Sequence, residues 1–514
     1  MKPVKRPQRV DPARLGRAKA AFEQLLGRDR TFFGEQDIRS YADKFAVDDR
    51  LHQPGGAIAG ETSEEIQAIV RIANEHRVAL WPISRGKNLG YGGSAPVLEG
   101  TIILDLSRMK AIEYDEENGT VLVEPGVSFY DLYDFLRQRG LKHWISVPGN
   151  SWGSVLGNAL DRGMGYTPYG EHASKICGLE VVMADSSLVR TGMGAVEGSP
   201  TWQLYRYGFG PAWDQMFVQS NFGIVTRMGL WLMPEPESLM GMDLEFDRPE
   251  DLGPLIDALA PLRREGLLQQ SPTIGNWLRA AAVLTTRDQW TDEKGYLPDT
   301  VIDAIRKKFN VGWWGVSLRL YGRESVNREA YRILEAEMNK LKPMVMRPTT
   351  WRRGEPIESS GWTGTPLTFP MQNANWHGGR GGHVGFSPVL PQSGSAAMAQ
   401  FKRTYERYRE FGMDYQASFA FGERHLINVN VVLLDKDDPE MMARVDPFFR
   451  TLVADAAAHG YGEYRTHLDY MDLVASTYGF NDNALWKLNQ KVKNALDPAG
   501  IIAPGKSGIW PAQT

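Results

Sequence analysis

The sequence has little cysteine, little excess charge and no long apolar run. Cysteine occurs once among 514 residues, at Cys177, so no disulfide can form within the chain, and we expect a buried thiol. The 58 lysines and arginines nearly balance the 62 aspartates and glutamates, which leaves a formal net charge of −4. No apolar stretch is long enough to cross a bilayer, and no secretory signal is recognisable. We therefore expect a cytoplasmic protein without nucleic-acid, membrane or metal partners.

The order of the expected elements divides the chain into three parts. Its length suffices for two or three domains, and 42% apolar with 23% charged residues is ordinary globular composition. Residues 1–237 mix short strands and helices and end in Pro-Glu pairs. Residues 238–460 repeat strand–helix units, which favours an α+β domain built around an antiparallel sheet, and residues 461–514 return with one helix.

Periodicity and caps place the elements along the chain. Helices are expected at residues 62–77, 128–140, 249–262, 325–341, 395–412, 439–460 and 482–498. Strands are expected at residues 78–84, 100–107, 119–126, 179–192 (a hairpin), 222–237, 240–246, 312–322, 381–390 and 426–435.

A glycine-rich loop, SRGKNLGYGGSAP at residues 84–96, is the first candidate binding element. Glycines let the backbone approach a ligand closely, and successive N–H groups in such a turn can bind an anion. Arg85 and Lys87 add positive charge that suits a pyrophosphate. The loop is neither a Walker loop nor GxGxxG, and taken alone an ordinary glycine-rich turn is equally compatible. A second such stretch at residues 147–170 favours a dinucleotide bound from two sides.

Six ordered stretches resemble the vanillyl-alcohol oxidase group of flavoproteins, which includes 4-alkylphenol oxidases and 4-cresol dehydrogenase. They are SRGKNLGYGG, GNALDRGMGYTPYGEH, QSNFGIVTRMGLWLMP, GGHVGFSP, GEYRTH and DPAGIIAPGKSGIWP. The resemblance implies an FAD-binding domain from residues 1–237 and 461–514, with a cap domain from residues 238–460. The FAD-binding positions that it implies are Ile83, Ser84, Arg85, Gly86, Lys87, Asn88, Leu89, Gly90, Pro148, Ser154, Gly157, Asn158, Tyr166, Ile224, Val225 and Lys506.

The resemblance also implies a covalent flavin anchor. The family's histidine in GGH-x-x-F-S-P bonds to the flavin 8α-methyl carbon, and that motif falls on His383. A neutral imidazole nitrogen can attack an electrophilic methyl group. A histidine with ordinary hydrogen-bond partners at a strand start is the alternative, and it is favoured for the neighbouring His377. Because 4-cresol dehydrogenase uses a tyrosine as its anchor, a histidine points toward the oxidases.

The catalytic positions that the resemblance implies are Tyr91, Tyr464 and Arg465. Together they would surround the phenolic oxygen of a substrate and stabilise its phenolate. The phenolate would release hydride from the para benzylic carbon to flavin N5 and give a p-quinone methide. Expected substrates are 4-alkylphenols, 4-alkyl- and 4-allylguaiacols and vanillyl-type alcohols, with O2 reoxidising the flavin to give H2O2.

The chain departs from the family at its two usual acids. The position of the aspartate near flavin N5 is Gly149, and the position of the acid on the opposite side of the pocket is Ser418, whereas Asp161 is interpreted as structural. The expected substrate pocket comprises Gly149, Trp152, Tyr166, Ser418 and Phe419. Without a carboxylate, the quinone methide should be hydrated slowly, or should lose a proton to give an alkenyl phenol.

Two other functions remain open, and so does the oligomeric state. One is a cytochrome-linked 4-alkylphenol dehydrogenase, which differs only in its electron acceptor. The other is a flavin-binding protein that has lost catalysis, which the missing acids motivate. The expected partners are a phenolic substrate and O2, and the family favours a homodimer or larger assembly.

Overall fold

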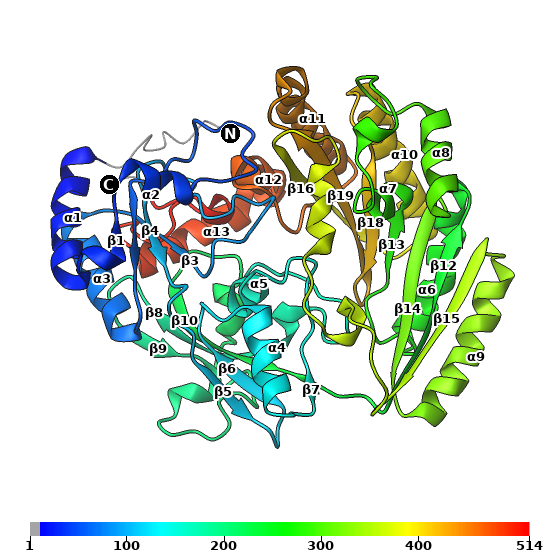
Figure 1. The fold of residues 1–514 in the computed structure, drawn as a ribbon. Coiled ribbons are helices and arrows are strands. Elements are labelled where there is room, and N and C mark those ends of the chain that lie inside the picture. The colour runs from blue at the N-terminus through cyan, green and yellow to red at the C-terminus, as the bar shows by residue number, and fades with distance from the viewer. Residues whose placement is uncertain (1–10, 513–514) are drawn as a thin grey trace.

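The computed structural model describes residues 11–512 and arranges them around three main β-sheets (Figure 1). Two smaller sheets lie in the N-terminal half, and one eight-stranded sheet lies in the middle of the chain. Among residues 11–512, no helix combines the length and apolarity needed to cross a membrane. The expected combination of helices with a large antiparallel sheet is confirmed.

The first sheet has the strand order β1–β2–β4–β3, with β2, β4 and β3 parallel. Its strands are β1 (Thr31–Phe32), β2 (Gly56–Ala59), β3 (Leu80–Ile83) and β4 (Ile102–Asp105). Helices α1 (Pro12–Leu26), α2 (Glu35–Ser40) and α3 (Ser63–His76) accompany it. Helix α3 begins as predicted, because the Thr62 hydroxyl accepts from the Glu65 amide at 3.2 Å. The buried stripe of α3 packs on the sheet, and the glycine loop follows the C-terminal end of β3.

The second sheet is antiparallel and has the order β5–β6–β10–β8–β9. Its strands are β5 (Ile112–Asp115), β6 (Thr120–Val123), β8 (Ile176–Val182), β9 (Leu188–Arg190) and β10 (Ile224–Trp231). A two-stranded ribbon, β7 (His143–Trp144) with β11 (Met233–Pro234), and helices α4 (Phe129–Gln138) and α5 (Val155–Leu160) accompany it. Cys177 is buried in β8, and burial raises the pKa of its thiol to about 12, so it is an inert core residue.

The third sheet is antiparallel throughout and has the order β15–β12–β14–β13–β18–β19–β16, with β17 paired to β19. Its strands are β12 (Ser238–Phe246), β13 (Thr273–Asn276), β14 (Trp314–Gly322), β15 (Val345–Arg352), β16 (Gly381–Phe386), β17 (Val389–Pro391), β18 (Gln416–Phe421) and β19 (His425–Asp435). Its helices are α6 (Leu252–Arg264), α7 (Trp277–Ala281), α8 (Asp299–Phe309), α9 (Glu324–Lys340), α10 (Gly394–Glu410) and α11 (Pro439–Ala458). Helices α6, α9, α10 and α11 lie beside this sheet (Figure 1), and their apolar residues form one core with it. Residues of the other face line a cavity.

The C-terminal segment returns to the first sheet. Helices α12 (Met471–Thr477) and α13 (Phe480–Leu496) precede a strand-like stretch in which Ile502 bridges Leu80 in parallel. A fully buried ion pair, Lys493 with Asp497 at 2.7 Å, holds this return, because the Lys493 ammonium also donates to two backbone carbonyls. The last residues thereby come beside the glycine loop that follows β3.

Candidate active site

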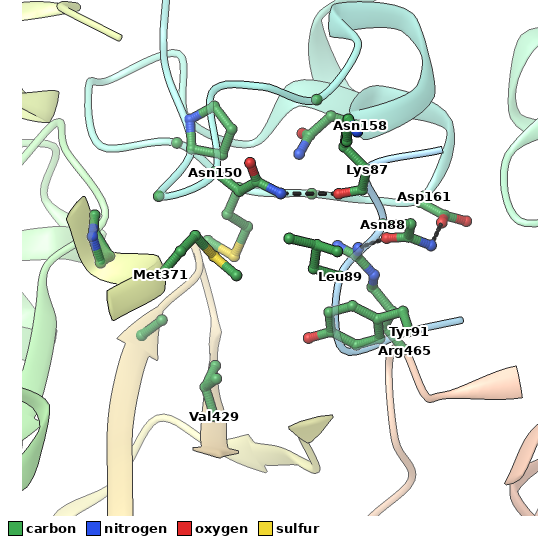
Figure 2. Close-up of a pocket in the computed structure, with 18 of the residues that line it drawn as sticks. Lys87, Asn88, Leu89, Tyr91, Asn150, Asn158, Asp161, Met371, Val429 and Arg465 are labelled. Carbon is green, nitrogen blue, oxygen red and sulfur yellow. Dashed lines mark hydrogen bonds between the residues drawn. The ribbon is translucent and has the colours of Figure 1, made fainter. Parts of the chain in front are cut away.

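A cavity of about 1080 Å³ runs between the open face of the third sheet and the two N-terminal sheets. It slightly exceeds the upper end of the usual range for one small-molecule site, ~1,000 Å³, and so has room for a large ligand beside a small one. Figure 2 shows part of its wall, with Met371 and Val429 facing Tyr91 and Arg465 across the space. The predicted site residues that line it are Ile83, Ser84, Arg85, Gly86, Lys87, Asn88, Leu89, Tyr91, Pro148, Gly149, Ser154, Gly157, Asn158, Tyr166, Ile224, Val225, His383, Ser418, Tyr464, Arg465 and Lys506.

The glycine loop leaves β3 and turns sharply into the cavity. Gly86, Gly90, Gly92 and Gly93 all have positive φ angles, between 56° and 112°, which side chains other than glycine rarely adopt. A Cβ atom at Gly90 would lie 2.5 Å from Nε2 of His383, so this position also needs glycine for close approach. Gly90 itself lies beneath the lining rather than in it. The loop therefore brings Tyr91 and the strand that carries His383 together.

Tyr91, Tyr464 and Arg465 meet at one end of the cavity. The guanidinium carbon of Arg465 lies 3.8 Å from the ring centroid of Tyr91. Burial raises the pKa of Tyr464, an effect that Tyr91 reinforces and Arg465 opposes. Burial acts to lower the pKa of Arg465, but Tyr91, Asp161 and Tyr464 outweigh it, so the pKa is raised and the group stays cationic. A fixed cation beside two hydroxyl groups can stabilise an aryl oxyanion.

Asp161 supports this cluster from behind, through the amide of Asn88. The Asn88 Nδ2 donates to Asp161 at 2.9 Å, and its Oδ1 accepts from the Arg465 guanidinium (Figure 2). Lys506 donates to the other Asp161 oxygen at 2.9 Å. Burial acts to raise the pKa of Asp161, but Lys506 and Arg465 outweigh it and the pKa is lowered. The side chains of Asn88 and Lys506, predicted to bind the cofactor, are therefore engaged in orienting Arg465.

Gln219 is a further supporting residue that the sequence pattern did not single out. Its Nε2 donates to the backbone carbonyl of Tyr464 at 2.9 Å, and it lines the cavity. Its position in QSNFGIVTRMG, one of the six family-like stretches, was the only signal available.

His383 lies on β16 and faces the cavity beside the glycine loop. Burial lowers the pKa of its imidazole to about 4, so the ring is neutral. Its Nδ1 is buried and has no hydrogen-bond partner. An unpaired buried nitrogen on a neutral ring fits the chemistry of a covalent anchor. His377 does not line the cavity and lies 3.9 Å from Asp414 instead.

The predicted substrate side of the cavity is only partly as expected. Gly149 and Tyr166 are neighbours: a Cβ atom at Gly149 would be 3.0 Å from the Tyr166 hydroxyl and 3.5 Å from Pro370. Ser418 lines the cavity from β18. Apolar lining comes from Met371 and Val429, which no sequence motif indicated (Figure 2).

Two pocket residues were predicted wrongly. Phe419 is completely buried on the helix-covered face of the third sheet, where its ring packs edge-on against Trp314 at 5.9 Å. It follows Ser418, and successive side chains of a strand point to opposite faces. Trp152 is 48% exposed and does not line the cavity. It lies in the turn just before Ser154, the N-cap of α5, and this turn directs its side chain outward.

Arg85 lines the cavity, but its guanidinium forms hydrogen bonds within the protein. Its guanidinium donates to the carbonyls of Trp152 at 3.0 Å and Gly126 at 2.9 Å. The positive charge that the sequence offered to a pyrophosphate is thus mostly used to join the two glycine-rich stretches.

Comparison with protein families and curated sequences identifies relatives of the whole chain. Residues 54–192 match the FAD binding domain family, and residues 369–507 match the C-terminal domain of FAD linked oxidases. The chain is 37% identical over 510 residues to the 4-cresol dehydrogenase [hydroxylating] flavoprotein subunit of Pseudomonas putida, covering 98% of this chain and 97% of that one. It is 29% identical over 542 residues to the 1'-carboxy-chondrochloren decarboxylase of Chondromyces crocatus, covering 97% and 98%.

Two solved structures share the fold over nearly their whole length. The 4-ethylphenol oxidase of Gulosibacter chungangensis, in its isoeugenol complex, superposes with a TM-score of 0.93 at 35% identity and covers 98% of this chain and 99% of that one. The substrate complex of p-cresol methylhydroxylase gives a TM-score of 0.93 at 36% identity, with 98% of each chain covered. These matches cover both FAD-linked family regions and the sheet between them.

Proposed function

Because the chain belongs to the flavoprotein family of vanillyl-alcohol oxidase and 4-cresol dehydrogenase, an FAD-dependent oxidoreductase family, we propose that it oxidises 4-alkylphenols at the para benzylic carbon and passes the electrons to O2. The single observation that carries the proposal is the cavity end where Arg465, Tyr91 and Tyr464 meet. Para-alkylated phenols suit the cavity because Met371 and Val429 provide apolar surface opposite that polar end.

The first step assigned to the chain's own residues is ionisation of the substrate. A free phenol has a pKa near ~10 and is mostly protonated at neutral pH. A guanidinium with two hydroxyl donors lowers that pKa by charge and by hydrogen bonding. Arg465 is held for this task by Asn88 and by its stack on Tyr91, so little reorganisation is needed when the oxyanion forms.

FAD, when bound, supplies the two-electron acceptor. The residues that would hold it are the glycine loop after β3, the turn before α5 that includes Pro148 and Ser154, and Ile224 with Val225 on β10. His383 is the covalent anchor in this proposal, which its neutral ring and unpaired Nδ1 support. In this proposal, residues 1–237 and 461–514 form the cofactor-binding domain and residues 238–460 form the cap.

The product follows from the loss of the two acids that the family is expected to carry beside the benzylic carbon. Gly149 and Ser418 stand where relatives are expected to carry carboxylates, and neither can activate water by general base catalysis. A p-quinone methide held in this cavity would therefore transfer a side-chain proton to water while its ring oxygen takes up a proton, which gives the isomeric alkenyl phenol, or would be hydrated slowly and without stereocontrol.

Turnover with a panel of para-substituted phenols tests the proposal. We expect 4-ethylphenol and 4-propylphenol to be oxidised with stoichiometric O2 consumption and H2O2 release, and 4-propylguaiacol to have a higher kcat/KM than vanillyl alcohol. If no 4-alkylphenol bleaches the flavin under anaerobic conditions, the proposed oxidation is contradicted, and a protein that binds flavin without catalysis is favoured.

A cytochrome-linked dehydrogenase is the second candidate. The 37% identity to a 4-cresol dehydrogenase flavoprotein subunit favours it, whereas the match to a 4-ethylphenol oxidase favours an oxidase. Stopped-flow reoxidation of substrate-reduced enzyme separates them: rapid reaction with O2 supports the oxidase, and slow reaction with O2 but rapid reaction with phenazine or cytochrome c supports the dehydrogenase.

A further inference from the structure

A row of paired residues crosses the open face of the third sheet and starts at the substrate side of the cavity. Ser418 on β18 pairs with Gly275 on β13. Gly275 pairs with Gly315 on β14, which in turn pairs with Glu245 on β12. All four residues line the cavity, and at the usual spacing of neighbouring strands the row spans roughly 14 Å. The cavity therefore continues sideways from Ser418 across the cap.

The two glycines in this row make room for side chains that lie flat on the sheet. A Cβ atom at Gly275 would be 2.8 Å from Cδ and 3.2 Å from Nη1 of Arg279, and one at Gly315 would be 3.1 Å from both carboxyl oxygens of Glu245. Arg279 comes from helix α7, which follows β13 directly. Its guanidinium thus lies over Gly275, one strand away from Ser418.

The acids nearest to this row have partners other than Arg279 or are exposed to solvent. Asp243 accepts two hydrogen bonds from Arg319, at 2.8 and 3.0 Å. Burial raises the pKa of Glu245, which accepts from the amide of Gly312 at 2.9 Å. Glu358 also lines the cavity but is exposed to solvent. In the part of the chain that the structure describes, none of these three acids forms an ion pair with Arg279.

Within residues 11–512, the Arg279 guanidinium makes no hydrogen bond or ion pair, and it lines the cavity. A guanidinium presents donors in a planar fork that matches a carboxylate. Val429, the cross-strand partner of Ser418, faces the cavity on the sheet side, opposite Tyr91 and Arg465 (Figure 2). A phenol whose oxygen lies at Arg465 directs its para substituent away from that end and toward the sheet.

We propose that Arg279 binds a carboxylate at the end of the substrate's para side chain, which makes 4-hydroxyphenylalkanoates a substrate class of this enzyme. This inference rests on the proposed function, because it needs a phenol bound at Arg465. Arg279 is a specificity residue: it takes no part in the oxidation, and neutral 4-alkylphenols bind without it.

The test compares two substrates of similar length, 3-(4-hydroxyphenyl)propanoate and 4-propylphenol, in the wild type and in Arg279→Met. We expect the substitution to lower kcat/KM for the propanoate by about 10- to 100-fold, the range for a hydrogen bond to a charged group, and to change kcat/KM for 4-propylphenol by less than about twofold. Arg279→Lys should restore part of the loss. Titration calorimetry should show the same difference in binding affinity.

Arg347→Met is the matched control, because Arg347 also lines the cavity but lies on β15, the edge strand beyond β12, and is therefore farther from Ser418 than Arg279 is. It should leave the ratio of the two substrates unchanged. An equal effect of Arg279→Met on both substrates, or no effect on either, overturns the carboxylate subsite. Turnover of 4-propylphenol by the wild type still supports the proposed function in that case. No turnover of 4-propylphenol by the wild type with any acceptor contradicts the proposed function itself.

Discussion

The guanidinium of Arg465 stacks on the ring of Tyr91, with 3.8 Å between its central carbon and the ring centroid. The two residues come from opposite ends of the chain, Tyr91 from the glycine loop and Arg465 from the segment after α11. A cation–π contact of this kind is worth ~0.5–2 kcal/mol and fixes the plane of the guanidinium. The stack therefore fixes the orientation of the cation without any ligand, as the proposed binding of a phenolic oxygen requires.

Replacing Arg465 should impair the reaction far more than substrate binding. Arg465→Met removes the charge proposed to stabilise the phenolate, and we expect kcat for 4-propylphenol to fall by ~10²–10³ with a smaller change in KM. Arg465→Lys should not rescue it fully, because an ammonium lacks the planar fork that stacks on Tyr91. Steady-state kinetics, with flavin content measured by absorbance, provides the check, and a loss of flavin in step with activity would point to a structural role instead.

Asn88 should act as a positioning residue. Asn88→Ala breaks the bridge between Asp161 and Arg465, and we expect about a tenfold decrease in kcat with a smaller change in KM. The pKa of bound substrate, read from the pH profile of kcat, should rise because the cation is less well held. An unchanged profile would mean that Asn88 serves only the loop.

His383→Ala should abolish covalent attachment of the flavin. In the wild type we expect flavin absorbance to remain with the acid-precipitated protein and the intact mass to include FAD. In His383→Ala the flavin should appear in the supernatant. His377→Gln is the matched control from the same segment, since His377 does not line the cavity, and it should keep the flavin attached. Release of flavin from the wild type would exclude His383 as a covalent anchor.

Introducing an acid at Gly149 should change the product. Gly149→Asp restores a general base beside the benzylic carbon, so 4-ethylphenol should give more alcohol and less alkenyl phenol. The new Cβ would be 3.0 Å from the Tyr166 hydroxyl, so Tyr166→Phe in the same protein gives it room. Chiral chromatography of the products decides the matter, with Tyr166→Phe alone as control. Rapid formation of one enantiomer by the wild type would contradict the role assigned to the missing acid.

Stability should decrease at alkaline pH because of His467. Burial acts to lower its pKa, but hydrogen bonds to Asp43 and Asp469 outweigh it and raise the pKa from 6.5 to about 9. A folded-state pKa above the unfolded one stabilises the fold fully below pH 6.5, and this contribution is lost as the pH rises through 9. We expect Tm to fall across that window. His467→Gln should have a lower Tm and a flatter profile, and an equal slope in both proteins would assign the effect elsewhere.

Local patterns predicted most of the elements, whereas the residues at one end of the cavity were indicated by family-like motifs. The Thr62 cap and the apolar stripe of α3 are local properties, and they were confirmed. Burial of Cys177 followed from its apolar strand. Phe419 was assigned to the wrong face because its strand is buried on both sides, so its sequence has no alternation to read. Trp152 was misplaced because the rotation of a turn depends on its surroundings.

The sequence by itself determined the family and the cofactor class, because motifs of contiguous residues keep their local chemistry wherever they fold, and through the same resemblance it indicated Tyr91, His383, Tyr464 and Arg465 as candidate site residues. Only the tertiary structure decided which groups meet: that Asn88 joins Asp161 to Arg465, that Lys506 pairs with Asp161, and that Arg279 lies over Gly275, the cross-strand partner of Ser418. Such contacts depend on strand register and on side-chain direction across sheets, which no short stretch of sequence specifies.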